Sequence, residues 1–217
     1  IVLELYSETL QKFRLAAQGF GAVQPPDHER ERIKTYFDPL PFWYAPFEHA
    51  QTDSAEFPLH ALTQRPPFMY HAWGSQNAWL RQIAARNFLY LHPQTASRYG
   101  VHDEDWIWIA SPLGRIRVQA KLHAATAPGT VWTWNAIGKR KGAWKLSGNA
   151  PESREGFLLN HLISELLPAA DHAHRYANAD PVTGQAAWFD LRVRIETDAE
   201  PRVPGHRIEP IARDAVR

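Results

Sequence analysis

A succession of short segments in which polar and apolar residues alternate restricts the fold of this chain more than any other feature. The clearest runs from Arg115 to Leu122, where every second residue is apolar. A period of two places successive side chains on opposite faces of a β-strand, so one face can be buried. A turn at Ser111–Gly114 joins this strand to a second one at Asp105–Ala110, which predicts a hairpin. Further strands are predicted at residues 58–63, 88–91, 130–134 and 187–195.

Short helices are predicted between these strands. Asn77 is placed to cap a helix that continues to Arg86, and Pro93 opens a second helix that ends at Gly100. Residues 157–167 are predicted to form a third helix. About six short strands interrupted by short helices are typical of an α+β, mainly β, barrel-like domain.

The region before the first barrel strand has a different character. Ser7 can cap a helix over residues 8–18. Five prolines between Pro25 and Pro46 then predict an extended arm and exclude a regular helix. The aromatic residues of the Pro41–Phe47 segment make this arm too apolar for a free linker, so we expect it to pack against another surface. The predicted organisation is an N-terminal arm or linker from a preceding domain at 1–56, a barrel at 57–196 and a C-terminal tail at 197–217.

Composition excludes several classes of protein. The 24 Lys and Arg residues nearly cancel the 23 Asp and Glu residues, so the net charge of +1 predicts no general attraction to nucleic acid. Without cysteine, the chain has no disulfide, no thiolate metal ligand and no cysteine-held iron–sulfur cluster. No apolar run approaches the ~20 residues that span a bilayer, and the 11 histidines match no metal-binding motif. We therefore predict a soluble protein with no metal site of its own, and the initial Ile1 suggests a piece of a longer protein.

Polar residues gather where the predicted strand at 58–63 ends. Thr63 and Arg65 are followed by His71 and by a Gly-Ser-Gln-Asn cluster at 74–77 that leads into a helix. Helix-terminal N–H groups, together with Ser, Gln, Asn and Arg side chains, can bind an anionic, heteroatom-rich ligand such as a phosphorylated cofactor. The same residues also suit an ordinary turn and helix cap, so both interpretations stay open.

Asp103 and Asp105 form a second candidate site. Two carboxylates can act as general acid and general base, but these lie between a helix end and a strand, where acidic residues commonly stabilise turns. A self-contained acid–base enzyme requires both carboxylates to converge in a pocket with perturbed pKa values.

Several motifs, in their order along the chain, point to a known family. The motifs are Leu5-Tyr6-Ser7-Glu8, Asp38-Pro39-Leu40-Pro41, Phe57-Pro58-Leu59, Leu62-Thr63-Gln64-Arg65, His71, Ser75-Gln76-Asn77, Leu91-His92-Pro93, Asp103-Glu104-Asp105, Asn160 and Asp180-Pro181-Val182-Thr183-Gly184-Gln185. This series resembles the C-terminal molybdopterin-dinucleotide-binding domain of molybdopterin oxidoreductase large subunits, the dimethyl-sulfoxide-reductase family. Gln64 and Glu104 stand where the family pattern has glycine. The resemblance covers nearly all of residues 1–196.

The resemblance implies a double-psi β-barrel of the aspartate-decarboxylase-like type, with short flanking helices and an extended N-terminal arm. It also implies a pair of molybdopterin guanine dinucleotides that carry molybdenum or tungsten. The metal ligand and the iron–sulfur cysteines of such enzymes lie upstream, so the resemblance implies no catalytic residue and no metal ligand here. By position in the family pattern, Thr63, Arg65, His71, Ser75, Gln76 and Asn77 would contact one dinucleotide or its pterin, and Asn160, Gly184 and Gln185 would reach the pterin side.

The implied parent protein is a two-electron oxidoreductase. Within the family, the sequence is most similar to proteins that act on inorganic sulfur compounds such as sulfite, thiosulfate or polysulfide. The implied partners are the preceding domains of the same polypeptide, an iron–sulfur subunit for electron transfer and a membrane-anchor subunit, in a prokaryote, with the cytoplasmic face favoured over the periplasmic one. Nucleic acid and direct membrane insertion are not expected. The alternative hypothesis is a stand-alone β-barrel that binds a partner protein through the Pro41–Phe47 arm and holds no redox cofactor.

Overall fold

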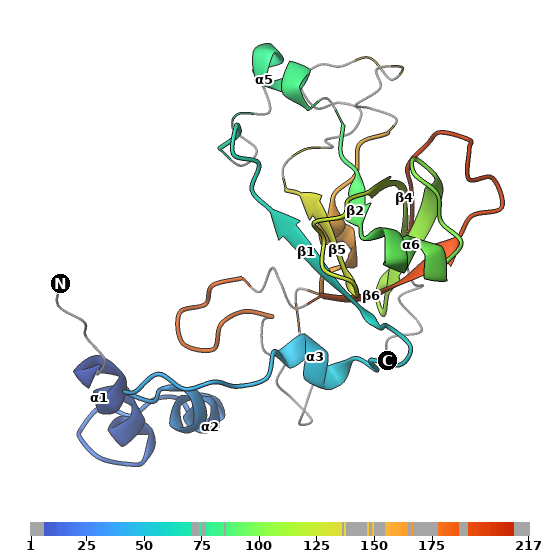
Figure 1. Cartoon of the computed structure of the whole chain (residues 1–217). Coiled ribbons are helices and arrows are strands. Elements are labelled where there is room, and N and C mark those ends of the chain that lie inside the picture. The colour runs from blue at the N-terminus through green and yellow to red at the C-terminus, as the bar shows by residue number, and fades with distance from the viewer. Residues whose placement is uncertain are drawn as a thin grey trace. The chain divides into compact units, whose positions relative to one another are not determined.

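The computed structural model describes residues 7–70, 74, 77–84, 86–135, 137, 147, 149, 155–164, 166, 178–186 and 191–210 (Figure 1). The chain forms two compact units. The first contains residues 1–50 and 165–187, and the second contains residues 51–164 and 188–217. The domain organisation predicted from the sequence instead places 165–187 inside the barrel domain.

The second unit is a closed barrel with one additional strand. Its strands are paired in the order β2-β5-β1-β6-β3-β4-β7, and a further pairing between β2 and β4 closes the ring of six. The pairs β1–β5 and β2–β4 are parallel, whereas the other pairs are antiparallel. Closure leaves the ring without an unpaired edge. The predicted double-psi β-barrel is confirmed, and its strands are β1 (Leu59–Gln64), β2 (Leu89–Leu91), β3 (Trp106–Ser111), β4 (Gly114–Leu122), β5 (Thr130–Trp134), β6 (Leu191–Thr197) and β7 (Arg207–Pro210).

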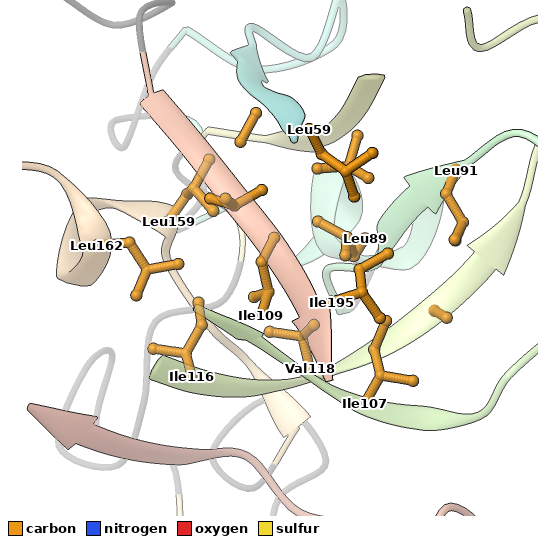
Figure 2. Close-up of a cluster of buried hydrophobic side chains, with 14 of the residues drawn as sticks. Leu59, Leu89, Leu91, Ile107, Ile109, Ile116, Val118, Leu159, Leu162 and Ile195 are labelled. Carbon is orange, nitrogen blue, oxygen red and sulfur yellow. The ribbon is translucent and has the colours of Figure 1, made fainter. Parts of the chain in front are cut away.

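Alternation along the strands fills the barrel with aliphatic side chains (Figure 2). On β4, Ile116, Val118 and Ala120 point inward and are fully buried. The predicted hairpin is confirmed, since β3 and β4 pair antiparallel across the turn between Ser111 and Gly114. Each fully buried aliphatic side chain contributes about 1.5–3 kcal/mol, so this core is the main source of the unit's stability.

Two of the predicted helices of this unit are confirmed. In α5 (Ala78–Ile83), the side chain of Asn77 accepts a hydrogen bond from the N–H of Trp79. The helix α6 (Pro93–Arg98) has a proline in its first turn, and Gly100 follows it with a φ of 63°. None of the described helices has the length and apolar character that crossing a bilayer requires.

The prediction of a regular helix over 157–167 is wrong. Only residues Leu159–Leu162 are helical in the described part of this segment, as the short 3-10 helix η2, and the residues at both of its ends are extended. Phe157, Leu159 and Leu162 all enter the barrel core. Leu159 and Leu162 lie three residues apart and so share one face of the 3-10 helix, whereas Phe157 reaches the core from the residues before it.

The first unit contains three helices in its described residues, namely α1 (Glu8–Ala17), α2 (Asp27–Tyr36) and α3 (Phe47–Gln51). Ser7 caps α1 as predicted. The helix α2 shows that the exclusion of a regular helix between Pro25 and Pro46 is wrong. Pro26 stands immediately before the first residue of α2, and the next proline, Pro39, follows its end. The prolines therefore lie on either side of a helix and not within it. Proline is tolerated at the start of a helix, where its missing N–H has no partner to lose.

Packing within this unit also involves the aromatic arm. Ile33 of α2 is buried with Ala17 of α1. The ring of Tyr36 lies 5.1 Å from that of Tyr44 and 5.4 Å from that of Phe47, both edge to face. Part of the Pro41–Phe47 arm thus packs on α2, as its apolar character predicts.

Candidate cofactor site at one end of the barrel

The carboxyl ends of the parallel strands β1 and β5 lie together at one end of the barrel. Thr63 of β1 pairs with Thr133 of β5, and Gln64 pairs with Trp134. The N–H of Asn135 donates to the carbonyl of Gln64 at 2.7 Å, so the pairing continues one residue past β5. From this end the chain continues toward α5 (Figure 1). Residues that follow the two strands therefore share one neighbourhood.

Along β1 and β5, the inward-facing residues become polar toward this end. Every second residue of β1 points inward, with Ala61 followed by Thr63. On β5 the inward residues are Val131 and then Thr133, and the same alternation brings Asn135 to this face. Thr63 is 6% exposed and Thr133 is 1% exposed. The sequence-predicted Thr63 thus lies beside a second buried threonine at this end of β1 and β5.

Two buried oxygen atoms at this end have no hydrogen-bond partner. They are the hydroxyl oxygen of Thr133 and Oδ1 of Asn135. An unpaired buried polar atom costs about 1–3 kcal/mol, so each such atom in a folded protein calls for an explanation such as a bound group. A heteroatom-rich cofactor at this end would satisfy both oxygens. The residues present therefore fit a hydrogen-bonding cofactor.

Asn87 organises the same end of the barrel. Its Nδ2 donates to the carbonyls of Trp134 at 2.9 Å, Ile137 at 3.2 Å and Phe157 at 3.4 Å. Its Oδ1 accepts from the N–H groups of Trp134 at 3.2 Å and Phe88 at 3.1 Å. Because every polar atom of this buried side chain is engaged, Asn87 shapes the site and is not itself a ligand contact. A single asparagine ahead of a short strand gives no sequence signal for such a role.

The exposed members of the predicted set lie in the same unit. Arg65 follows β1, and its guanidinium carbon lies 5.9 Å from the centroid of the Tyr70 ring. Asn77 is exposed and caps α5, which confirms the helix-cap interpretation of that residue without testing a cofactor contact. Asn160 is exposed on η2. His71, Ser75 and Gln76 lie outside the described residues, so their proposed contacts stay predictions.

Gly184 and Gln185 belong to the first unit. They close a turn in which the N–H of Gly184 donates to the carbonyl of Asp180 at 3.0 Å, while the N–H of Asp180 donates to the carbonyl of Gln185 at 2.7 Å. Gly184 has a φ of 73°, a conformation that glycine adopts without strain. The turn is attached to its own unit, because Arg32 of α2 donates to the carbonyl of Pro181.

Asp180 is the centre of this turn. Its Oδ1 accepts from the N–H of Val182 at 3.0 Å and from the N–H and hydroxyl of Thr183 at 2.6 and 2.9 Å. Its Oδ2 accepts from the hydroxyl of Tyr44 at 3.0 Å. Partial burial tends to raise the pKa of Asp180, but these hydrogen bonds outweigh it, so the pKa of the carboxyl lies below its usual value.

Asp103 and Asp105 act as turn residues. Asp103 accepts from the N–H of Leu122 at 2.8 Å and from the Lys121 ammonium at 2.7 Å. Burial raises the pKa of Asp103, but these hydrogen bonds outweigh that effect, so its pKa lies below the usual value. A carboxyl group with a lowered pKa is ionised near neutral pH and has no proton to donate there. The carboxylate of Asp105 accepts a hydrogen bond from the N–H of His102 at 2.7 Å and forms an ion pair with Arg202 at 3.1 Å. This arrangement does not support the acid–base hypothesis. Within the described residues, no group of three or more metal-ligating side chains converges.

Comparison with known proteins identifies the family. A family model described as the Molydopterin dinucleotide binding domain matches residues 59–174, more than half of the chain. The chain belongs to this family. The matched range of the molybdopterin dinucleotide-binding domain includes the polar barrel end, with Thr63, Arg65, Thr133 and Asn135, and stops before Gly184.

This molybdopterin dinucleotide-binding domain matches only a part of each of several longer proteins. A sulfite dehydrogenase subunit from Allochromatium vinosum is 56% identical over 216 residues, which cover 98% of this chain and 22% of that protein. Dopamine dehydroxylase of Eggerthella lenta is 33% identical over 45% of this chain and 9% of its own length. Trimethylamine-N-oxide reductase 1 of Escherichia coli is 28% identical over 41% of this chain and 11% of its own length. The resemblance to the dimethyl-sulfoxide-reductase family is thereby confirmed.

A solved structure supports the same fold. Acetylene hydratase from Pelobacter acetylenicus matches with a TM-score of 0.53, covering 76% of this chain and 22% of that chain at 21% sequence identity. At this identity the similarity concerns the fold alone. It agrees with the closed barrel that the strand pairings define.

Proposed function

We propose that this chain is the cofactor-binding domain of a molybdoenzyme catalytic subunit that oxidises an inorganic sulfur compound. The cofactor would be a pair of molybdopterin guanine dinucleotides that carry molybdenum or tungsten. The identity of 56% to the sulfite dehydrogenase subunit, across 98% of the chain, carries this proposal, and it favours sulfite over thiosulfate or polysulfide. Since the chain spans 22% of that relative, the metal ligand and any iron–sulfur cysteines would lie elsewhere in the parent protein.

In the reaction, this chain would bind the cofactor and orient it. When bound, the molybdopterin centre supplies the two-electron redox chemistry. Exposed Arg65 would donate paired hydrogen bonds to the diphosphate, and Thr63 would offer its hydroxyl at the edge of the barrel interior. A long anionic ligand needs many hydrogen bonds from neutral donors, with few full charges. The further proposed contacts are His71, Ser75, Gln76, Asn77, Asn160, Gly184 and Gln185.

The same relative supports the presence of partner subunits. Its name describes one subunit of a sulfite dehydrogenase, which supports an enzyme with several subunits. We propose that electrons leave through an iron–sulfur subunit, and that a membrane-anchor subunit completes the complex. The preceding domains of the same polypeptide would close the cofactor site.

Analysis of the purified full-length parent protein tests the proposal. Acid hydrolysis should release guanine nucleotide together with molybdenum or tungsten, and the protein should oxidise sulfite with an artificial electron acceptor. A preparation that is folded and free of guanine nucleotide would contradict the proposed cofactor and favour the protein-interaction module. A nucleotide-loaded protein that is inactive on sulfite would contradict only the substrate.

Arg65→Ala tests the proposed contact with the diphosphate. We expect the nucleotide to be released about tenfold faster from this variant, since a hydrogen bond to a charged group contributes about 1.5–3 kcal/mol. The measurement is the rate of nucleotide loss at a fixed temperature. Arg98→Ala is the matched control, because Arg98 is an exposed arginine on α6, which follows the opposite end of the barrel. Equal release rates in the two variants would refute the contact.

A further inference from the structure

We infer that Thr133 and Asn135 bind the N–H-bearing edge of a heterocycle of the cofactor. This inference rests on the proposed function and extends it to residues that the family motifs do not include. The two residues stand on the inward face of β5 and its continuation, beside Thr63. They follow Val131, which belongs to the aliphatic core.

Position in the barrel supports the assignment. The alternation that buries Val131 also directs Thr133 and Asn135 to the same face, at the end where β1 and β5 both finish. Asn135 is half-buried, whereas Thr133 lies one step deeper. A group bound at this end would meet Asn135 first and Thr133 next.

Chemistry selects the class of group. Oδ1 of Asn135 is buried and unpartnered, and an amide oxygen can only accept hydrogen bonds. A diphosphate at neutral pH has no N–H or O–H to donate, so it cannot satisfy this oxygen. A pterin or a guanine carries amino and ring N–H donors along one edge. The hydroxyl of Thr133, also unpartnered, can accept from or donate to the same edge.

Asn87 provides the contrast within the same end of the barrel. Its Nδ2 and Oδ1 are fully used by backbone groups of Trp134, Ile137, Phe157 and Phe88. The polar atoms of this asparagine, which serves the fold, are all paired. The unpaired oxygens of Thr133 and Asn135 point to a partner outside the chain.

Substitutions that separate binding from stability test this inference. Thr133→Val removes a hydroxyl that has no partner in the fold, so the melting temperature of the chain should stay equal or rise. In the full-length parent, the same variant should release guanine nucleotide about tenfold faster, which corresponds to one lost hydrogen bond. Thr95→Val is the matched control. The hydroxyl of Thr95 accepts from the N–H of Gly129 at 3.3 Å, so this variant should lower the melting temperature and leave the release rate unchanged.

Two variants of Asn135 identify the bound group. Asn135→Leu should accelerate release about tenfold, while Asn135→Asp should restore slow release, because a carboxylate still accepts from N–H donors. If Asn135 instead donated to the diphosphate, Asn135→Asp would release nucleotide faster than Asn135→Leu through charge repulsion, and the inference would be wrong. Wild-type release rates in Thr133→Val and Asn135→Leu would overturn it as well. A wild-type parent without guanine nucleotide would overturn both this inference and the proposed function.

Discussion

Glu104 has a backbone conformation that L-residues rarely adopt. Its φ of 67° lies in the left-handed region, and no other non-glycine residue in the described part of the chain has a positive φ. The turn imposes it, because the N–H of Glu104 donates to the carbonyl of Ala120 at 3.0 Å and its own carbonyl accepts from Nε2 of Gln119 at 3.0 Å. The family pattern has glycine at this position. The departure seen in the sequence therefore has a conformational cost of about 1 kcal/mol or more.

Glu104→Gly should remove this cost, whereas Glu104→Ala should retain it. Both variants lose the ion pair between Glu104 and Lys121, which is exposed and contributes at most about 1 kcal/mol. Glycine adopts the left-handed conformation freely, whereas alanine keeps the strain. We expect Glu104→Gly to be more stable than Glu104→Ala by about 1 kcal/mol in urea denaturation. If Glu104→Ala proves at least as stable, the turn does not impose the strain we assign to it.

Residues at the candidate site differ in how visible they are in the sequence. Thr63 lies near the end of the strand β1 and Arg65 directly follows this strand, so the change from apolar to polar residues marks them. Thr133 lies within the equally clear strand β5 and Asn135 directly follows it, but nothing in an alternating pattern says which other strand lies beside it. Thr133 and Asn135 can be assigned to the candidate site only from the structure, where β1 and β5 pair in parallel and Thr63 lies opposite Thr133.

At the scale of elements, the sequence predicts strands better than helices. A strand with one buried face shows its period of two directly, and each of the six strands of the closed ring overlaps a predicted one. The sequence does not predict α2, because the prolines around it resemble interruptions of a helix. The spacing of the aliphatic residues in 157–167 predicts a long helix. In the structure, the aliphatic residues Leu159 and Leu162 are instead buried by the short 3-10 helix η2. The strand β7 lies in the segment predicted as a tail and has three exposed residues among its four, so it lacks a hydrophobic pattern.

Arg117 holds the connection between β6 and β7 against the barrel. It is 2% exposed and lies over the ring of Trp106, with 5.1 Å to the centroid. Its guanidinium donates to the carboxylate of Asp198 and to the carbonyls of Glu200, Val203 and Gly205, each carbonyl at 2.8 Å. A planar fork with several donors makes this set of bonds possible. A side chain on β4 thus fixes the whole segment between Asp198 and Gly205.

Arg117→Lys should release this segment. Lysine keeps the charge but cannot reach four acceptors with a planar fork, so we expect a loss of about 2 kcal/mol in the free energy of unfolding. Hydrogen exchange should also accelerate in β7, including at Ile208, which pairs with Ile116. Arg115→Lys is the control on the same strand. Arg115 is 41% exposed and pairs with Glu196 and Glu209, so its replacement should cost less than about 1 kcal/mol. Equal losses in both variants would contradict the role of Arg117.

At the scale of the whole molecule, both compact units rely on carboxylates whose pKa is lowered. In the barrel unit these include Glu196 and Asp198, where burial raises the pKa but hydrogen bonds from arginine outweigh it. In the first unit, burial also raises the pKa of Asp180, and hydrogen bonds from Thr183, Tyr44 and Val182 outweigh it, so this pKa is lowered too. A group with a lowered folded-state pKa binds fewer protons when folded, so it stabilises the protein above its unfolded pKa of about 4. That contribution disappears as the pH falls through the folded-state pKa. The chain should therefore lose stability in acid.

Asp180→Asn isolates one such contribution. The amide oxygen can still accept hydrogen bonds, but without the charge these are weaker, so the variant should be about 1 kcal/mol less stable than wild type near pH 7. Lowering the pH protonates Asp180 in the wild type, so the two proteins should converge toward pH 3. Urea denaturation at pH 7, 5 and 3 measures the difference. Asp27→Asn is the control, because the Asp27 side chain is 96% exposed on α2, where it forms an ion pair with Arg30 one turn along the helix. That variant should stay within about 0.5 kcal/mol of wild type at each pH. A difference between wild type and Asp180→Asn that is as large at pH 3 as at pH 7 would show that the charge of Asp180 does not stabilise the turn.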